Sequence, residues 1–335
     1  MAYIKTFDGL AAQQCDFLSR YYHDLGVFLH FQEHPILRQI LFLRPEWATG
    51  AVYKLVDTKE VVKACGRFDF AQLRTIWFEY PEDKHLYLIT LMKKFELCFQ
   101  IEDTDSYIIP ELLTPSAPDF AWDYQGNLGR EYQYEFMPSG ILTRCIVITH
   151  HLIERGLYWR NGTILTREGN RGLIISDPFQ KKIKIWISGP SRKDLLSIVR
   201  EKIDYIHKTL NQPRVRQMVK CICTECIDAQ TPYFYDYETL RSFHTKGKSK
   251  VACSHSAEDV SIELLLGGIG DVVLNSEAEV LGLLRSLKAR YDDEERVLEQ
   301  ANKIIQLQPN FMGVGVNLNA LIKRLFLKDG DKPKA

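Results

Sequence analysis

The sequence contains no apolar run long enough to cross a bilayer. One of its longest apolar stretches, Ile262–Ile269, is interrupted by Glu263 and two glycines, whereas a membrane-spanning helix needs about 20 apolar residues. An excess of charge is also missing, because 43 Lys and Arg balance 43 Asp and Glu. No global field therefore steers the chain onto nucleic acid or an acidic membrane. Residues Met1–Lys5 lack the features of a signal peptide. We expect a cytoplasmic protein with no membrane partner.

A nucleotide-binding motif is missing as well. Gly247-Lys248-Ser249 resembles the end of a P-loop, but Ser242 stands where that motif requires a glycine. We expect no nucleotide to be bound by this chain. The composition is that of an ordinary globular protein, with 45% hydrophobic and 26% charged residues. Because a single core rarely grows beyond about 250–300 residues, a chain of 335 residues predicts at least two packed units.

The first predicted unit, residues 1–113, is mainly helical. Apolar residues three or four apart predict helices over Leu10–Leu25, Phe70–Phe78 and Glu82–Phe95. Asp57 and Asp69 are candidate helix N-caps, Asp57 as part of a capping box with Glu60. Leu97–Ile101 and Tyr107–Ile109 predict a β-hairpin around a polar turn. Helices followed by a hairpin are the element order of a winged helix.

A proline-containing linker, residues 114–123, leads into a second unit at 124–212. Alternating residues from Tyr132 to Phe136 predict a strand, and Ile141–Glu154 predicts a helix. Asn161-Gly162 predicts a hairpin with a type I′ turn, in which both turn residues have positive φ. The expected fold class is α+β, with an antiparallel sheet that has one face open to water. Residues 271–335 are expected to form a C-terminal helical segment with a polar tail.

A cysteine-rich extension, residues 213–270, carries the most specific local pattern. Cys221 and Cys223 share one side of a predicted strand end, and Cys223-x-x-Cys226 has the spacing that wraps two thiolates around one zinc ion. Cys253 is the expected fourth ligand, and His255 or His244 could replace it. We predict one structural zinc, with four reduced thiols and no metal as the alternative. The four isolated cysteines are expected to be small buried apolar side chains, namely Cys15, Cys65, Cys98 and Cys145.

Two other functions are compatible with these features. A winged helix combined with a zinc ribbon could bind nucleic acid, since Arg214–Arg216 and Lys246–Lys250 place basic residues on both sides of the cysteines. The zero net charge makes a solvated surface the better interpretation of these residues. A cysteine or zinc enzyme is the other alternative, and four cysteine ligands would leave such a zinc no open position.

Several segments resemble one family. They are Leu25-Gly26, Leu29-His30-Phe31, Arg44-Pro45-Glu46-Trp47-Ala48-Thr49, Ala51-Val52-Tyr53-Lys54-Leu55, Phe95-Glu96-Leu97-Cys98, Tyr107-Ile108-Ile109-Pro110-Glu111-Leu112-Leu113 and Tyr134-Glu135-Phe136-Met137-Pro138. In this order and spacing, over residues 8–210, they resemble the COR domain of Roco proteins. The cysteine region resembles a segment that follows COR in some prokaryotic members.

The resemblance implies two subdomains, COR-A and COR-B, which correspond to the two predicted units. It implies that the first packs on Roc, a Ras-like GTPase domain of the same protein, and that the second forms a homodimer that brings two GTPase domains together. By position, Tyr107 would face Roc. The chain itself would be a non-catalytic dimerisation and signal-coupling module, because the GTPase motifs lie in Roc.

Overall fold

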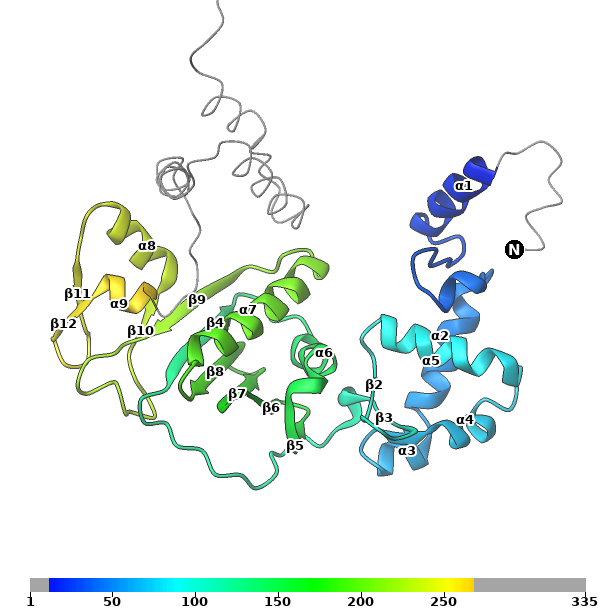
Figure 1. The fold of residues 1–335 in the computed structure, drawn as a ribbon, viewed down its shortest axis with the longest axis horizontal. Helices are drawn as coiled ribbons and strands as arrows, with labels where there is room; N and C mark the ends of the chain where they lie inside the picture. Colours follow the sequence, from blue (N-terminus) through cyan, green and yellow to red (C-terminus); the bar gives the residue numbers. More distant parts are fainter. Residues whose placement is uncertain (1–11, 268–335) are drawn as a thin grey trace, which may run out of the picture. The chain divides into compact units, whose positions relative to one another are not determined.

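The computed structural model describes residues 12–267. All of them belong to the first of the two units into which the chain divides, residues 1–270. The described part combines helices with antiparallel sheets, which confirms the predicted α+β class (Figure 1). The predicted C-terminal helical segment, residues 271–335, lies outside the described residues.

Residues 12–113 form a helical subdomain. Its helices and short 3-10 helices are α1 (Ala12–Asp24), η2 (Leu37–Gln39), α2 (Pro45–Val56), α3 (Lys59–Lys63), α4 (Phe70–Ile76), η3 (Glu82–Lys84), α5 (His85–Lys94) and η4 (Pro110–Leu112). Three short strands pair in the order β1-β3-β2, namely β1 (Arg67–Asp69), β2 (Phe99–Gln100) and β3 (Ser106–Ile108). The β2–β3 hairpin was predicted. Strand β1 was not, because three residues between two helices are too short to show an alternating pattern.

The two predicted N-caps have different outcomes. Asp69 accepts a hydrogen bond from the backbone N–H of Gln72 at 2.7 Å, and the Gln72 side chain accepts one from the N–H of Asp69 at 2.9 Å. This capping box begins α4 as predicted. The box predicted at Asp57 is wrong, because Asp57 ends α2 and Thr58 precedes α3. The Thr58 hydroxyl donates to the carbonyl of Lys54 at 2.6 Å, so it completes α2 and does not cap α3.

Residues 128–267 form the sheet subdomain and its extension. The strands and helices of the subdomain are β4 (Leu128–Tyr134), α6 (Ile141–Ile148), η5 (His150–Leu152), β5 (Ile153–Trp159), β6 (Gly162–Arg167), β7 (Asn170–Asp177), β8 (Lys182–Ser188), α7 (Arg192–Thr209), β9 (Val215–Lys220) and β10 (Phe234–Asp236). The extension continues with α8 (Tyr237–Thr245), β11 (Lys250–Ala252), β12 (Asp259–Ser261) and α9 (Ile262–Gly267). The strand order β10-β9-β4-β8-β7-β6-β5 makes one antiparallel sheet of seven strands.

Helices α6 and α7 cover one face of this sheet and build the larger core. Leu195, Val199 and Ile203 on α7 are buried against apolar residues of the sheet. The helix predicted over Ile141–Glu154 is too long, because α6 ends at Ile148 and Ile153 already begins β5. The short 3-10 helix η5 separates the two elements, so the apolar periodicity of this segment spans a helix and a strand.

The predicted β5–β6 hairpin exists, but its turn is different. Trp159 pairs with Gly162, so Arg160 and Asn161 form the two-residue loop, and neither Asn161 nor Gly162 has a positive φ. The predicted type I′ turn is therefore wrong. Gly162 is required for another reason, because a Cβ at this position would lie 2.0 Å from the buried ring of Trp159.

Part of the second face of the sheet is covered, so the predicted face open to water is found only where Gln133, Lys182 and Arg216 lie. An extended segment that we call the strap, residues 118–127, follows this face. Its side chains alternate, with Phe120, Trp122 and Tyr124 half-buried and their neighbours exposed. Phe120 stacks on Trp159 at 5.6 Å between ring centroids, and Tyr124 meets the ring of Trp186 edge-on at 5.2 Å. Most of the predicted linker thus packs as part of the fold.

In the described part of the chain, no helix combines the length and the apolar character that a membrane span requires.

Candidate metal centre

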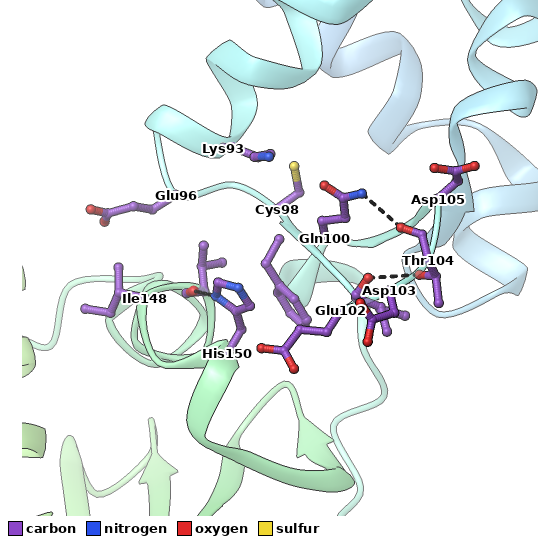
Figure 2. A pocket seen from close by; sticks show the side chains of 13 residues that line it. Lys93, Glu96, Cys98, Gln100, Glu102, Asp103, Thr104, Asp105, Ile148 and His150 are labelled. Atoms are coloured by element: carbon purple, nitrogen blue, oxygen red, sulfur yellow. Dashed lines mark hydrogen bonds between the residues drawn. The ribbon is translucent and has the colours of Figure 1, made fainter. Parts of the chain in front are cut away.

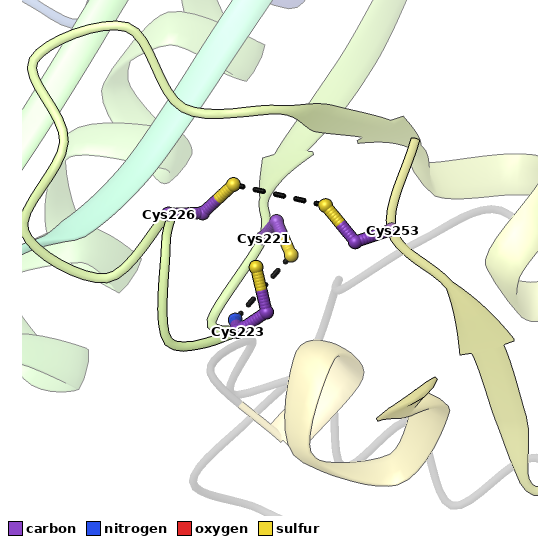
Figure 3. Close-up of side chains that lie close together, drawn as sticks. All are labelled: Cys221, Cys223, Cys226 and Cys253. Atoms are coloured by element: carbon purple, nitrogen blue, oxygen red, sulfur yellow. Dashed lines mark hydrogen bonds between the residues drawn. The ribbon is translucent and has the colours of Figure 1, made fainter. Parts of the chain in front are cut away.

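The structure brings the four predicted cysteine ligands together. Strand β9 ends at Lys220, so Cys221 leaves the sheet directly, and Cys223 and Cys226 follow in a tight turn (Figure 3). In that turn the N–H groups of Cys226 and Ile227 donate to the carbonyl of Cys223, at 3.1 Å and 2.9 Å. Cys253 arrives from the end of β11, and all four sulfur atoms lie within 4.8 Å of one another.

Each sulfur accepts a hydrogen bond from a nearby group. The backbone N–H groups of Cys223, Tyr233 and His255 donate to the sulfurs of Cys221, Cys226 and Cys253, at 3.4, 3.3 and 3.3 Å. The Ser256 hydroxyl donates to the sulfur of Cys223 at 3.3 Å. Such donors favour the thiolate form of cysteine, which is the form that binds a metal.

The distances and burial agree with a closed tetrahedral site. Four ligands at Zn–S distances of about 2.3 Å place their sulfurs about 3.8 Å apart, and the sulfurs of Cys226 and Cys253 are separated by 3.8 Å. All four cysteines are free of disulfides and at most 1% exposed. His255 lies at the edge of the cluster, with Nδ1 4.0 Å from the sulfur of Cys226. His244 lies on α8 and is not part of the cluster.

The pKa values of these thiols show why a cation would matter. Burial raises the pKa of Cys221 and of Cys226 above the usual range for a thiol. Burial also tends to raise the pKa of Cys253. Hydrogen bonds, led by those from the N–H groups of Ser256 and His255, lower this pKa overall. Burial therefore favours the protonated thiols of Cys221 and Cys226. A divalent cation would stabilise their thiolates.

The other predicted residues lie away from this centre. Tyr107 on β3 is 7% exposed, and its ring stacks on that of Phe68 at 5.4 Å. Its predicted orientation toward Roc stays a prediction. Cys98 and Cys145 are buried as expected, and burial raises the pKa of each thiol to about 12, whereas Cys65 is only half-buried.

A second feature was not predicted. A cavity of about 810 Å³ opens between the β2–β3 loop and the end of α6 (Figure 2). Its lining includes Glu96, Glu102, Asp103 and His150. The sequence held no signal for it, because the two segments that line it are about 45 residues apart and meet only in the folded chain.

Two family models match the chain in order. The model described as C-terminal of Roc, COR-A domain, matches residues 2–113, and the one described as C-terminal of Roc, COR-B domain, matches residues 125–268. The fold and site define an α+β protein of two joined subdomains with a buried cysteine cluster. The chain belongs to the COR domain family of Roco proteins, in which COR stands next to a Roc GTPase domain.

The relatives include much longer proteins. Probable serine/threonine-protein kinase pats1 of Dictyostelium discoideum is 26% identical over 274 residues, which are 76% of this chain and 8% of that protein. The Roc-COR-CHAT protease of Runella zeae is 27% identical over 144 residues, which are 42% of this chain and 15% of that protein. The solved structure of Methanosarcina barkeri Roco2 RocCORdC bound to GDP is 32% identical, covers 33% of this chain and 35% of its own, and has a TM-score of 0.30.

The chain thus spans 15% or less of the length of these two curated relatives. The kinase and protease activities in these two names are those of the named relatives. The comparisons give the nucleic-acid interpretation no support.

Proposed function

We propose that this chain is a non-catalytic coupling module. It packs on a Roc GTPase domain of the same protein and brings two copies together, so that GTP hydrolysis depends on the dimer. The observation that carries this proposal is the consecutive match to COR-A at residues 2–113 and COR-B at 125–268. COR is the part of Roco proteins that stands beside the GTPase, and coupling follows if the contacts between the two differ between the nucleotide states of Roc.

The sheet subdomain is the proposed dimer surface. Phe136 and Phe179 are 75% and 99% exposed, which is unusual for phenylalanine. They lie in neighbouring loops, because the N–H of Tyr134 donates to the carbonyl of Lys181 at 2.9 Å. A stable dimer buries about 1,200 Å² or more around an apolar centre. These two side chains offer such a centre.

Light scattering at micromolar concentration tests the dimer. We expect twice the chain mass of 38.9 kDa. We also expect Phe136→Ser together with Phe179→Ser to shift the chain toward monomer. The matched control is Phe78→Ser, which changes a phenylalanine that is 72% exposed on the helical subdomain. A chain that stays monomeric, alone and with its Roc domain added, contradicts the proposal.

We further propose that Cys221, Cys223, Cys226 and Cys253 bind one structural zinc. The support is the set of four buried sulfurs within 4.8 Å, each with a hydrogen-bond donor. Zinc would join β9 to the extension, whose own elements are short.

Metal analysis of the chain purified without chelator tests the zinc proposal. We expect about one zinc per chain. Cys253→Ser should remove most of it, whereas Cys145→Ser, which changes a buried cysteine on α6, should leave it bound. A wild-type metal content near zero contradicts the zinc site and leaves the coupling proposal intact.

A further inference from the structure

The end of the strap is held by the same turn that carries two of the cysteines. Ile227 and Asp228 directly follow Cys226. The Asp228 carboxylate accepts a hydrogen bond from the backbone N–H of Gly126 in the strap, at 3.0 Å. Two segments about 100 residues apart in the sequence therefore meet at the metal centre.

Lys220 makes a second connection between the turn and the strap. Its side chain is 4% exposed, and its ammonium group donates to the carbonyl of Ile227 at 2.6 Å and to that of Asn127 at 3.1 Å. The same ammonium lies 5.4 Å from the ring centroid of Trp186, and Tyr124 of the strap meets the same ring edge-on. A buried ammonium needs its acceptors, so the positions of both carbonyls are coupled through Lys220.

The turn has little apolar anchoring outside its cysteines. Ile227 is 40% exposed, and Thr224 and Glu225 are also exposed. The turn is held by its own short hydrogen bonds, by the contact of Thr224 with Glu258, by the Lys220 ammonium on the carbonyl of Ile227, and by the sulfurs of Cys223 and Cys226. Without a cation those sulfurs contribute only weak thiol contacts. Metal ligation of Cys223 and Cys226 would therefore add the strongest restraint on the position of Ile227 and Asp228.

We propose that metal bound at Cys221, Cys223, Cys226 and Cys253 fixes the strap to the second face of the sheet, with Asp228 and Lys220 as the connecting residues. This inference rests on the proposed zinc site. The strap is the segment between the helical subdomain and β4. Metal occupancy therefore controls how firmly the connection between the two subdomains is held.

Amide hydrogen exchange on the full chain tests the inference, after the metal content of the same sample has been measured. The main readout is the Gly126 amide, and the Ile174 amide in the centre of β7 reports the global fold. We expect zinc removal by a chelator to speed exchange at Gly126 at least tenfold and to leave Ile174 unchanged. In the zinc-loaded protein, we expect Asp228→Ala to have the same effect on Gly126 with zinc retained. The matched control is Glu225→Ala, which removes an exposed carboxylate from the same turn and should change neither amide.

The outcomes separate the two proposals. A chain that binds no zinc overturns both. A chain that binds zinc but keeps Gly126 equally protected after chelation overturns only the connection to the strap. If chelation also speeds exchange at the Ile174 amide, the zinc-loaded Asp228→Ala protein is the deciding measurement. Retained protection of the Gly126 amide in that protein overturns the inference. Lost protection of Gly126 with zinc still bound supports it.

Discussion

A buried imidazole makes the stability of the sheet subdomain depend on pH. His207 on α7 is 7% exposed, and its Nε2 lies 2.8 Å from the hydroxyl of Tyr134 on β4. The ring of Tyr132 packs against it edge-on at 5.7 Å. Burial lowers the pKa of His207 from 6.5 to about 4. The folded protein therefore keeps this imidazole neutral at a pH where an unfolded chain would protonate it.

Acid should weaken the fold through His207. Between pH 6.5 and about 4 the unfolded chain binds a proton that the folded chain does not, so stability falls as the pH falls and is unaffected above this window. We expect a loss of roughly 2 kcal/mol, with solvent screening allowed for. Urea unfolding at several pH values measures it. His207→Gln should remove this part of the acid dependence. Tyr134→Phe should lower stability but leave the acid dependence in place. An unchanged acid slope in His207→Gln would contradict the assignment.

At the scale of elements, one ion pair joins α6 to the end of α5. Arg144 Nε lies 2.7 Å from a carboxylate oxygen of Glu96, and these side chains are 22% and 11% exposed. The Tyr205 hydroxyl on α7 also bonds to Glu96, and this bond raises the pKa of Tyr205. Glu96 therefore connects the helical subdomain to both helices that cover the sheet.

Replacing Arg144 with an uncharged residue should lower the free energy of unfolding. Arg144→Met leaves the mostly buried Glu96 carboxylate with the Tyr205 hydroxyl but without a cation, and we expect a loss of about 1–3 kcal/mol in unfolding free energy. The matched control is Arg214→Met, because Arg214 and Glu135 are 3.4 Å apart but 85% and 70% exposed. It should cost less than about 0.5 kcal/mol. Chemical denaturation of both variants, with a double-mutant cycle that includes Glu96→Gln, measures the difference. Equal losses in the two variants would refute this role for Glu96.

Regular elements were predictable where a pattern is long, and they were mistaken where a pattern changes within a few residues. The apolar period over Glu82–Phe95 identified α5, and alternation identified β4. The helix over Ile141–Glu154 was made too long because the apolar residues of α6 and β5 run together. The strap alternates as a strand does, yet Pro118 at its start and Pro115 just before it suggested a linker. Its packing depends on partners such as Trp159 and Trp186, which lie far along the chain.

The cysteine cluster could be predicted because its geometry is mostly local. Cys221, Cys223 and Cys226 occupy six residues, so spacing alone brings three sulfurs close together. Cys253 was a candidate by residue type, and strands β11 and β12 supply the turn back to the cluster. The contacts of Lys220 were not predictable. One of its acceptors lies 93 residues away, and no residue pattern encodes that distance.

At the scale of the molecule, the two subdomains share part of one core. Phe99 on β2 and Ile108 on β3 come from the helical subdomain but are buried in the core that α6, α7 and the sheet build. The Phe99 ring stacks on that of His150 at 5.2 Å and meets Tyr158 edge-on at 6.0 Å. A change in one subdomain can thus reach the other through packed side chains, as a coupling module requires.

Truncating Phe99 should separate the unfolding of the two subdomains. Phe99→Ala removes a ring that is 6% exposed, and such truncations cost about 3–5 kcal/mol. In the wild type, we expect the amides of Met92 in α5 and Ile174 in β7 to exchange through one common opening. In Phe99→Ala, Met92 should exchange at least tenfold faster than Ile174 as denaturant is added, because the helical subdomain then opens alone. Phe78→Ala, which removes a ring that is 72% exposed, is the control and should keep both amides together. If Phe99→Ala also keeps them together, the shared core does not couple the subdomains, and the signal must pass through the Glu96 contacts or the strap.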